Sequence, residues 1–246
     1  MAVHLDEHFT YKKIAKAVFS PILMMVFTSI YSIVDGVFVS NFVGKTAFAA
    51  LNLVFPVTMV LGSLGFMMGA GGSALVAKTL GEGDKEKANK IFSGVVYSTI
   101  ILGIIVSLAV VFFVEPISKL LGATDEMLPY CKLYGQILIG AEVLFMVQNL
   151  FQTFFIVAER PQLGFAVTAI AGVTNIILDA AFVVGAKLGL AGAAYATIIG
   201  QFLGAIIPLS TLCVPTRACC DSANPPLPLA CSFRLLPTVR ANCSAI

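Results

Sequence analysis

Six apolar stretches, each long enough to cross a membrane as a helix, determine what this chain can fold into. A membrane-spanning α-helix needs about 20 apolar residues, and short polar connections separate the stretches. They lie near residues 18–43, 47–77, 91–114, 133–157, 163–185 and 188–209. Continuous runs such as "STIILGIIVSLAVVFFV" differ from the alternating short strands of a membrane β-barrel. The sequence predicts an all-α integral membrane protein with a bundle of six transmembrane helices.

Composition and loop charge support this interpretation. Hydrophobic residues make up 59% of the 246 residues and charged residues 11%, too few to cover a soluble domain with polar surface. The net charge of +2 is dispersed over the connections and gives no indication of nucleic-acid binding. About eight Lys and Arg flank the spans on the side of the amino terminus and about four on the other side. We therefore expect a cytoplasmic amino terminus in a multi-pass protein of the plasma membrane.

The chain divides into three parts. Residues 1–17 form a polar segment that we expect to be cytoplasmic, and residues 18–209 form the helical lobe. Residues 210–246 hold five of the six cysteines and five of the eleven prolines and have no helical period, so a seventh span is excluded. The cysteine spacing lacks the paired C-x2-C units of a zinc site. Disulfide bonds would require an extracytoplasmic tail, yet an even number of crossings returns the tail to the cytoplasm, where thiols stay reduced. We expect a disordered or non-native tail, as a shifted reading frame or a misjoined gene end would produce.

Two aspartates lie well inside apolar stretches, Asp35 in "IVDGVFV" and Asp179 in "ILDAAFV". A charged side chain at mid-bilayer costs about 2.5 to 3.5 kcal/mol on insertion scales, so it normally faces a cavity or a partner. Asp35 follows Lys16 by 19 residues and Asp179 follows Arg160 by 19 residues, which places both about 28 Å into the membrane. The two carboxylates are predicted to share a pocket in the outer half of the membrane. The alternative is that each aspartate caps a helix end or reaches the outer interface.

Two further polar residues accompany the acids. Asn175 precedes Asp179 by one helical turn and projects from the same face. Thr197, on the returning sixth helix, reaches a similar depth. Carboxylate, amide and hydroxyl oxygens suit a shared proton or a sodium ion and suit soft metals badly. We predict a cation site formed by Asp35, Asn175, Asp179 and Thr197, with no organic cofactor and no other metal.

Other polar and small residues have less specific interpretations. Gln148 and Gln152 are one turn apart and are candidates for a substrate path, although interhelical hydrogen bonding explains them equally well. Glu142 occupies an apolar setting in the same stretch. Glycines at G-x-x-x-G spacing predict close helix packing; they are Gly65, Gly69, Gly200 and Gly204. The glycine-rich segment that contains two of them lacks the preceding strand and final G-K-[ST] of a phosphate-binding loop.

Three segments resemble the multidrug and toxic compound extrusion (MATE) transporters. They are "SIYSIVDGVFVSNFVG", "FMMGAGGSALVAKTLGEGDKEKA" and "TNIILDAAFVVGAKLGLAGAAYATIIGQ", and the resemblance extends over residues 10–209. It implies the amino-terminal lobe of a twelve-helix protein that exports cationic or aromatic drugs in exchange for protons or sodium, which makes the chain a transporter and not an enzyme. It also implies that Asp35, Asn175, Asp179 and Thr197 bind the coupling cation.

The chain departs from that family by containing one lobe followed by the irregular tail. Alternating access requires a partner for the lobe, so we expect a truncated form that works through self-association or another chain, with drugs and membrane lipid as its other partners. Two rival functions remain. A lipid-precursor flippase needs cationic residues in its cavity for pyrophosphate, and no Lys or Arg lies deep in the spans. An intramembrane aspartyl protease needs Asp35 and Asp179 as its catalytic pair, yet neither lies in a G-x-G-D motif; the "GEGD" at 81–84 belongs to a solvated loop.

Overall fold

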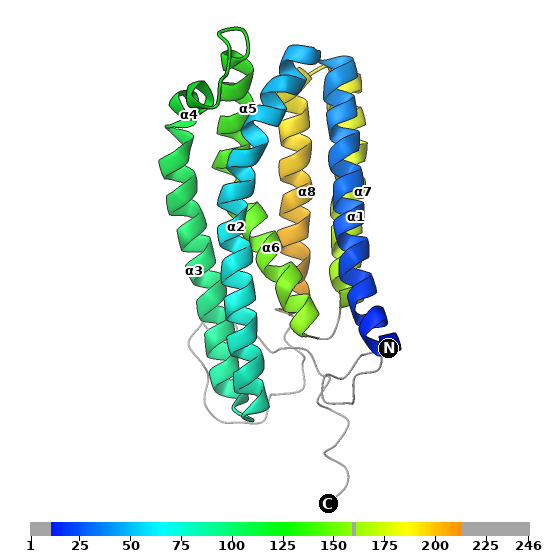
Figure 1. The fold of residues 1–246 in the computed structure, drawn as a ribbon, viewed down its shortest axis with the longest axis vertical. Coiled ribbons are helices and arrows are strands. Elements are labelled where there is room, and N and C mark those ends of the chain that lie inside the picture. The colour runs from blue at the N-terminus through cyan, green and yellow to red at the C-terminus, as the bar shows by residue number, and fades with distance from the viewer. Residues whose placement is uncertain (1–10, 159–160, 213–246) are drawn as a thin grey trace, which may run out of the picture.

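The computed structural model describes residues 11–158 and 161–212, and every regular element within them is helical. The long helices run alternately up and down along one common direction (Figure 1). In chain order the elements are α1 (Tyr11–Phe42), α2 (Lys45–Gly81), α3 (Lys85–Val111), α4 (Val114–Leu120), α5 (Leu128–Gly140), α6 (Glu142–Val157), α7 (Pro161–Asp179), the π-helix η1 (Ala180–Gly185) and α8 (Gly189–Leu212).

The prediction of six membrane spans is confirmed, with one difference in the fourth. Five helices are each long and apolar enough to cross a membrane, and α5 with α6 forms a sixth span that is bent by 51°. α1 begins at Tyr11, before the expected start at residue 18, and α8 continues to Leu212. From residue 213 on, the predicted irregular tail lies outside the described residues. The break in the fourth span is a feature that the continuous apolar run did not indicate.

Short turns force neighbouring helices to lie antiparallel. Gly83, with φ 86°, adopts a backbone conformation that residues with a Cβ rarely reach. Asp84 then caps α3 by accepting a hydrogen bond of 2.9 Å from the Lys87 N–H group. Gly44, with φ 127°, makes the corresponding turn between α1 and α2. These tight turns leave few polar residues between spans, which is what a chain that crosses a membrane repeatedly requires.

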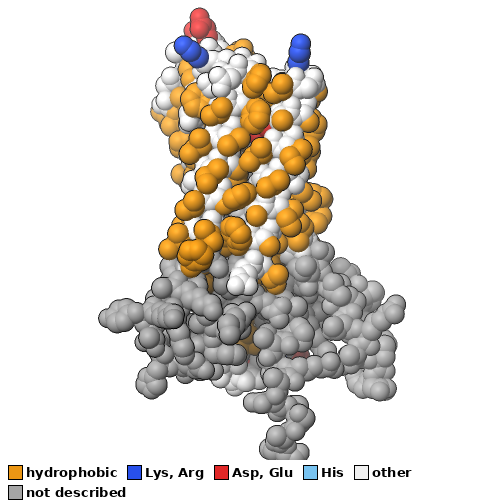
Figure 2. Space-filling model, turned by 90° about the vertical axis from the view of Figure 1, so that its right-hand side faces the viewer, with side chains coloured by type: hydrophobic (Ala, Val, Ile, Leu, Met, Phe, Trp, Pro, Cys, Tyr) orange, Lys and Arg blue, Asp and Glu red, His pale blue; other side chains and the backbone are white. Residues whose placement is uncertain are grey.

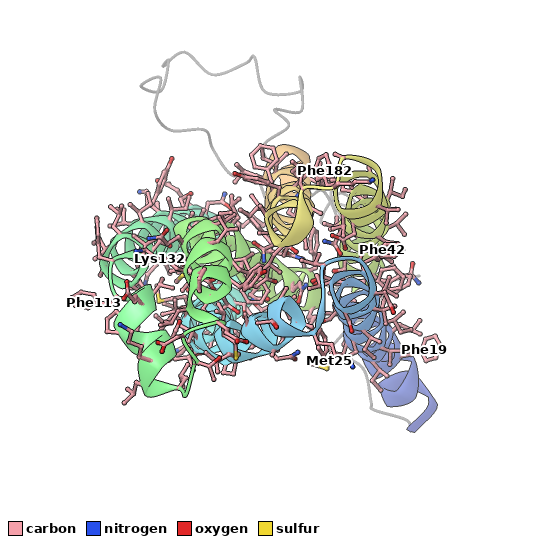
Figure 3. The ribbon with its side chains drawn as sticks, turned by 90° about the horizontal axis from the view of Figure 1, so that it is seen from above. Phe19, Met25, Phe42, Phe113, Lys132 and Phe182 are labelled. Atoms are coloured by element: carbon pink, nitrogen blue, oxygen red, sulfur yellow. The ribbon has the colours of Figure 1, made fainter. Side chains whose placement is uncertain are left out.

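The outer surface of the bundle is apolar. Met25, Val60 and Leu120 are 68%, 68% and 87% exposed, and hydrophobic side chains cover the face in Figure 2. Seen from above, Phe19 and Phe113 point away from the bundle (Figure 3). An apolar patch of this extent is unfavourable in water, whereas lipid chains solvate it without cost. The arrangement is that of a multi-pass membrane protein.

Inside the bundle, α2 packs against α6 with very little space between them. A Cβ atom added at Gly65 would lie 2.5 Å from both the Cα and the carbonyl oxygen of Met146. At Gly69, four residues on, it would overlap the Thr153 hydroxyl group. Only glycine permits this approach, and close contact is the main source of helix association where lipid replaces water.

Gly65→Ala is expected to lower the free energy of unfolding by about 1 to 3 kcal/mol, because the added methyl group must displace the α6 backbone. The measurement is thermal unfolding of the purified chain in detergent. Gly71→Ala is the matched control on the same helix, since a Cβ there meets nothing within 4 Å. That variant should be neutral or slightly stabilised by the better helix propensity of alanine. Equal behaviour of the two variants would contradict the packing argument.

Candidate functional site

The two predicted acids come together at one end of the bundle. Asp35 lies on α1 and Asp179 is the last residue of α7, and these two helices pack side by side along their length. Asp35 is 9% exposed and Asp179 is fully buried. The carboxylates are close enough to act on each other electrostatically. No ion pair involves either of them in the described part of the chain.

A change of helix type follows directly after Asp179. The next residues, Ala180–Gly185, form the π-helix η1, in which the Ala186 N–H group donates to the Ala181 carbonyl oxygen at 2.8 Å. A π-helix holds more residues per turn than an α-helix and occurs mostly as short segments at functional sites. Asp179 therefore lies at a junction where the helix geometry is already altered.

Asn175 and Thr197 join the acids from α7 and α8. The Asn175 Nδ2 atom donates to Thr197 Oγ1 at 3.5 Å, and the Thr197 hydroxyl group donates to the Ala193 carbonyl oxygen at 2.9 Å. This orientation leaves the Asn175 Oδ1 atom buried and without a hydrogen-bond partner. The four residues of the predicted site thus lie on three mutually packed helices, α1, α7 and α8.

A small polar cavity of about 10 Å³ adjoins these residues. Its size is close to that needed for one water molecule. It is enclosed by α1, α6, α7 and α8, and its lining residues are Tyr31, Gln148, Ala171, Gly172, Asn175, Thr197, Gly200 and Gln201. Gln148 lines it, whereas Gln152 does not: the Gln152 Nε2 atom donates to Thr168 Oγ1 at 3.4 Å. The structure therefore separates the two glutamines that the sequence treated alike.

Six buried side-chain oxygens on α1, α6, α7 and α8 lack a hydrogen-bond partner, and all are acceptors. Three belong to residues that line the cavity, Asn175 Oδ1, Gln148 Oε1 and Gln201 Oε1, and three belong to the acids, Asp35 Oδ1 and both carboxylate oxygens of Asp179. Buried acceptors without donors are rare in folded proteins, because each keeps the full cost of its lost hydration. A group of acceptors alone, with no Lys or Arg among them, has the chemistry of a site for a cation. The described residues contain no cluster of three or more His, Cys, Asp or Glu.

The structure adds three residues that the sequence interpretation missed. Tyr31 lies one turn before Asp35 and Gln201 one turn after Thr197, so helical spacing from a known site residue would have found both. Tyr134, buried on α5, lies within electrostatic reach of both acids. No local spacing links it to them, because only the packing of α5 against the rest of the bundle brings it there.

Glycines bring α8 close to its neighbours around the cavity. A Cβ at Gly200 would lie 3.1 Å from the Ala171 carbonyl oxygen and 3.2 Å from the Asn175 Cβ atom. At Gly204 it would lie 2.7 Å from Gln148 Cδ. Small residues at these positions let the polar side chains of α6 and α7 reach the same cavity.

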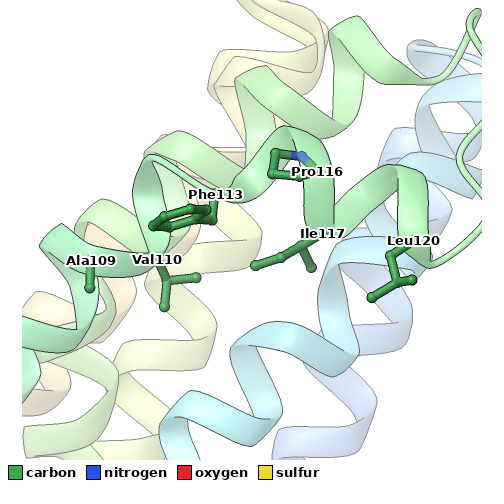
Figure 4. A pocket seen from close by; sticks show the side chains of 6 residues that line it. All are labelled: Ala109, Val110, Phe113, Pro116, Ile117 and Leu120. Carbon is green, nitrogen blue, oxygen red and sulfur yellow. The ribbon is translucent and has the colours of Figure 1, made fainter.

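A surface groove of about 350 Å³ lies apart from this site (Figure 4). It lies where α3 passes into α4, and its lining is apolar: Ala109, Val110, Phe113, Pro116, Ile117 and Leu120. None of the polar residues described above contributes to it. A lipid-facing groove of this kind has no group that could orient a charged ligand.

Comparison with known families identifies the chain. Residues 21–181, more than half of the chain, match the family model described as MatE. The chain belongs to the MatE family. The resemblance inferred from its sequence motifs is thereby confirmed.

Curated relatives of this MatE chain are named multidrug export proteins. MepA of Staphylococcus saprophyticus is 30% identical over 192 residues, which cover 74% of this chain and 41% of the relative. MepA of Staphylococcus haemolyticus is 26% identical over 209 residues, which cover 81% of this chain and 45% of the relative. The chain spans less than half the length of the curated relatives it matches.

Solved structures show the same fold. A MOP superfamily transporter from Pyrococcus furiosus superposes with a TM-score of 0.77 at 24% sequence identity, over 85% of this chain and 48% of that chain. A crystal structure of MATE in the bent conformation gives a TM-score of 0.77 at 24% identity, over 82% of this chain and 45% of that one. The helical bundle predicted from the sequence is therefore the fold found in MATE transporters.

Asp179→Leu is expected to raise the free energy of unfolding by about 1 to 3 kcal/mol. The substitution removes a buried carboxylate whose two oxygens lack partners and replaces it with an apolar side chain of similar size. Thermal unfolding in detergent measures the effect. At the exposed Asp125 the same change should alter stability by less than about 0.5 kcal/mol. A destabilised Asp179→Leu protein would contradict this expectation and would indicate that the carboxylate makes favourable contacts in the folded protein.

Proposed function

We propose that this MatE chain is a lobe of a multidrug efflux transporter that exchanges cationic or aromatic drugs for protons or sodium ions. The observation that carries the proposal is the pair of buried acids, Asp35 and Asp179, on neighbouring helices with no basic partner among the described residues. Keeping two such acids in an apolar bundle costs stability, so a function must compensate for it. Membership of the MatE family supports cation-coupled export as that function.

The cation site consists, in this proposal, of Asp35, Asn175, Asp179 and Thr197. Protons on the acids, or a sodium ion held by the acids and the Asn175 Oδ1 atom, would remove the negative charge of the pocket. A cationic drug is stabilised by the ionised pocket, whereas the coupling ion neutralises it. Ion and drug therefore favour different states of the lobe, and this difference in affinity drives exchange.

Gln148 is the stronger candidate for a substrate path, together with Gln201. Both line the polar cavity and both keep an unpartnered amide oxygen. Gln152 is the weaker candidate because its amide group already bonds to Thr168. The buried polar face of α6 and α8 would thus extend from the cation site toward the other end of the bundle.

Export by rocking between two access states requires a second lobe. We propose that the partner is a second copy of the chain or another chain, and that the amino terminus is cytoplasmic. The end of the bundle where α1 begins also carries the α2–α3 turn (Figure 1), with Lys78, Lys85, Lys87 and Lys90. With Lys12, Lys13 and Lys16 at the start of α1, that end holds seven of the described lysines. The other end holds four, Lys45, Lys119, Lys132 and Lys187, and this difference supports the orientation.

A lipid-precursor flippase is the second candidate and has less support. Binding of a pyrophosphate group requires cationic side chains in the cavity. The lysines of the described residues lie at helix ends or in connections, and none lines the polar cavity.

Expression of residues 1–246 in a pump-deficient host is expected to lower ethidium accumulation, and Asp35→Asn or Asp179→Asn should each abolish the effect. Each substitution replaces a carboxylate with a neutral amide, so binding of the coupling ion no longer changes the charge at that residue. Asp125→Asn, at an exposed site, is the control and should behave like the unchanged chain. Membrane expression is checked for all variants. Unchanged accumulation with well-expressed protein would exclude export by this chain alone, and an active Asp179→Asn variant would exclude the site.

Thermal stability in sodium chloride and in choline chloride distinguishes the two coupling ions. A ligand that binds only the folded protein raises stability as its concentration rises. Sodium coupling predicts a higher melting temperature in sodium chloride for the unchanged chain and not for Asp179→Asn. Proton coupling predicts the same melting temperature in both salts.

A further inference from the structure

Glu142 is a third buried acid, and it lies apart from the proposed cation site. The residue is 2% exposed, it begins α6, and its Oε1 atom has no hydrogen-bond partner. An ionised carboxylate in such a place loses the stabilisation that water provides and gains none from a counter-ion. The Glu142 carboxyl group therefore needs a stabilising interaction other than water or a counter-ion.

Its position coincides with the break in the fourth span. α5 and α6 meet at 51°, and Ala141 between them has φ −105° and ψ 10°. Two short-range hydrogen bonds mark the break, from the Ala141 N–H group to the Leu138 carbonyl oxygen at 3.0 Å and from the Leu144 N–H group to the Ala141 carbonyl oxygen at 2.9 Å. Broken helices inside membrane proteins line ligand sites, because their free backbone ends need polar partners. Glu142 is the ionisable side chain at this break.

Helix α3 packs closely against the start of α6, next to the break. A Cβ at Gly103 of α3 would lie 3.1 Å from the Val143 Cα atom, next to Glu142 in the chain. Ser107, one turn further along α3, is buried, and its Oγ atom has no hydrogen-bond partner. Two adjacent elements, α6 and α3, therefore each carry one buried, unpartnered side-chain oxygen, on Glu142 and on Ser107.

The electrostatic surroundings of Glu142 are distinct from those of the acid pair. Asp35 and Asp179 lie on two helices that pack against each other, whereas Glu142 begins α6, and no ion pair involves Glu142 in the described part of the chain. Tyr134 precedes Glu142 by eight residues in the same span, about 12 Å along a helix. The titratable side chains on the elements that pack against α5 and α6 are Lys45 and Lys78 of α2, Lys85, Glu86, Lys87, Lys90 and Tyr97 of α3, Glu115 and Lys119 of α4, Asp179 of α7 and Tyr195 of α8, and those of α5 itself are Tyr130, Cys131, Lys132 and Tyr134.

We propose that the α5–α6 break is a second cation-binding site of the lobe and that its ligand is a proton carried by Glu142. A metal cation needs several oxygens to replace its hydration shell, and the unpartnered side-chain oxygens described here come from Glu142 and Ser107 alone. A proton needs one carboxylate oxygen. By converting Glu142 to a neutral carboxylic acid, it removes the charge that the break has no means to stabilise. This proposal does not rest on drug export.

Infrared spectroscopy of the full chain in lipid vesicles tests the proposal. The starting protein carries Asp35→Asn and Asp179→Asn, so that the acid pair contributes no carboxylic acid signal. At neutral pH we expect the C=O stretch of a protonated carboxylic acid, which Glu142→Gln removes. Glu126→Gln, at an exposed glutamate, is the matched control and should leave the band unchanged. A missing band in the starting protein, or a band that survives Glu142→Gln, would overturn the proposal.

A second measurement avoids the Glu142 substitution, in case that variant fails to fold. Dicyclohexylcarbodiimide reacts with protonated carboxylic acids in apolar surroundings, and mass spectrometry of the digested protein locates the adduct. We expect modification of Glu142 in the unchanged chain at neutral pH, to the same extent in sodium chloride and in choline chloride. Protection of Glu142 by sodium would overturn the proton as the ligand. A Glu142 that stays unmodified in a protein that also lacks the carboxylic acid band would show an ionised carboxylate and overturn the proposal.

Discussion

The hydrocarbon core of a membrane offers no hydrogen bonds, so the chain itself must satisfy every polar group that lies there. Helices do this for the backbone. Many hydroxyl groups within the spans, with Ser107 an exception, follow the same rule by donating to carbonyl oxygens three or four residues earlier in their own helix. Examples are Thr58, Ser73, Thr79, Thr99, Thr153, Thr168 and Thr197. Unlike these hydroxyl groups, several buried oxygens of the acids and amides have no hydrogen-bond partner within the described part of the protein.

Close helix packing fixes the positions of these buried polar side chains. Lipid chains cover an apolar helix surface as favourably as another helix does. Helices in a membrane therefore associate through close contact of small residues. Gly65 and Gly69 allow α2 to approach α6, and Gly200 and Gly204 allow α8 to approach α7 and α6. The polar groups of α1, α6, α7 and α8 are thereby held around one small cavity. The same contacts that hold the bundle together also fix the distances within the candidate site.

The sequence predicted what depends on apolar length and on spacing within a helix. The six spans follow from long apolar runs, and equal depth predicted that Asp35 and Asp179 would meet. It did not predict the break at Ala141, because no proline marks it and Glu142, the charge beside it, does not by itself indicate a change of helix direction. The π-helix after Asp179 likewise contains no proline, and the aspartate before it does not indicate a change of helix type. Tyr134 joins the acids only through packing between α5 and the other helices, which no single helix encodes.

The two irregularities in the helices share one property: each lies directly beside a buried acid. Asp179 ends α7 where η1 begins, and Glu142 begins α6 where the fourth span is broken. A regular α-helix binds all its backbone groups to itself, so a charge on its side chain has little influence on its geometry. At a junction the backbone is less constrained, and a change in the charge of the acid alters the balance between two local arrangements. A cation that binds either acid can shift that balance only by as much as its affinity differs between the arrangements. If the proposed cations bind at these acids, the two junctions are the places where binding would act on the helix geometry.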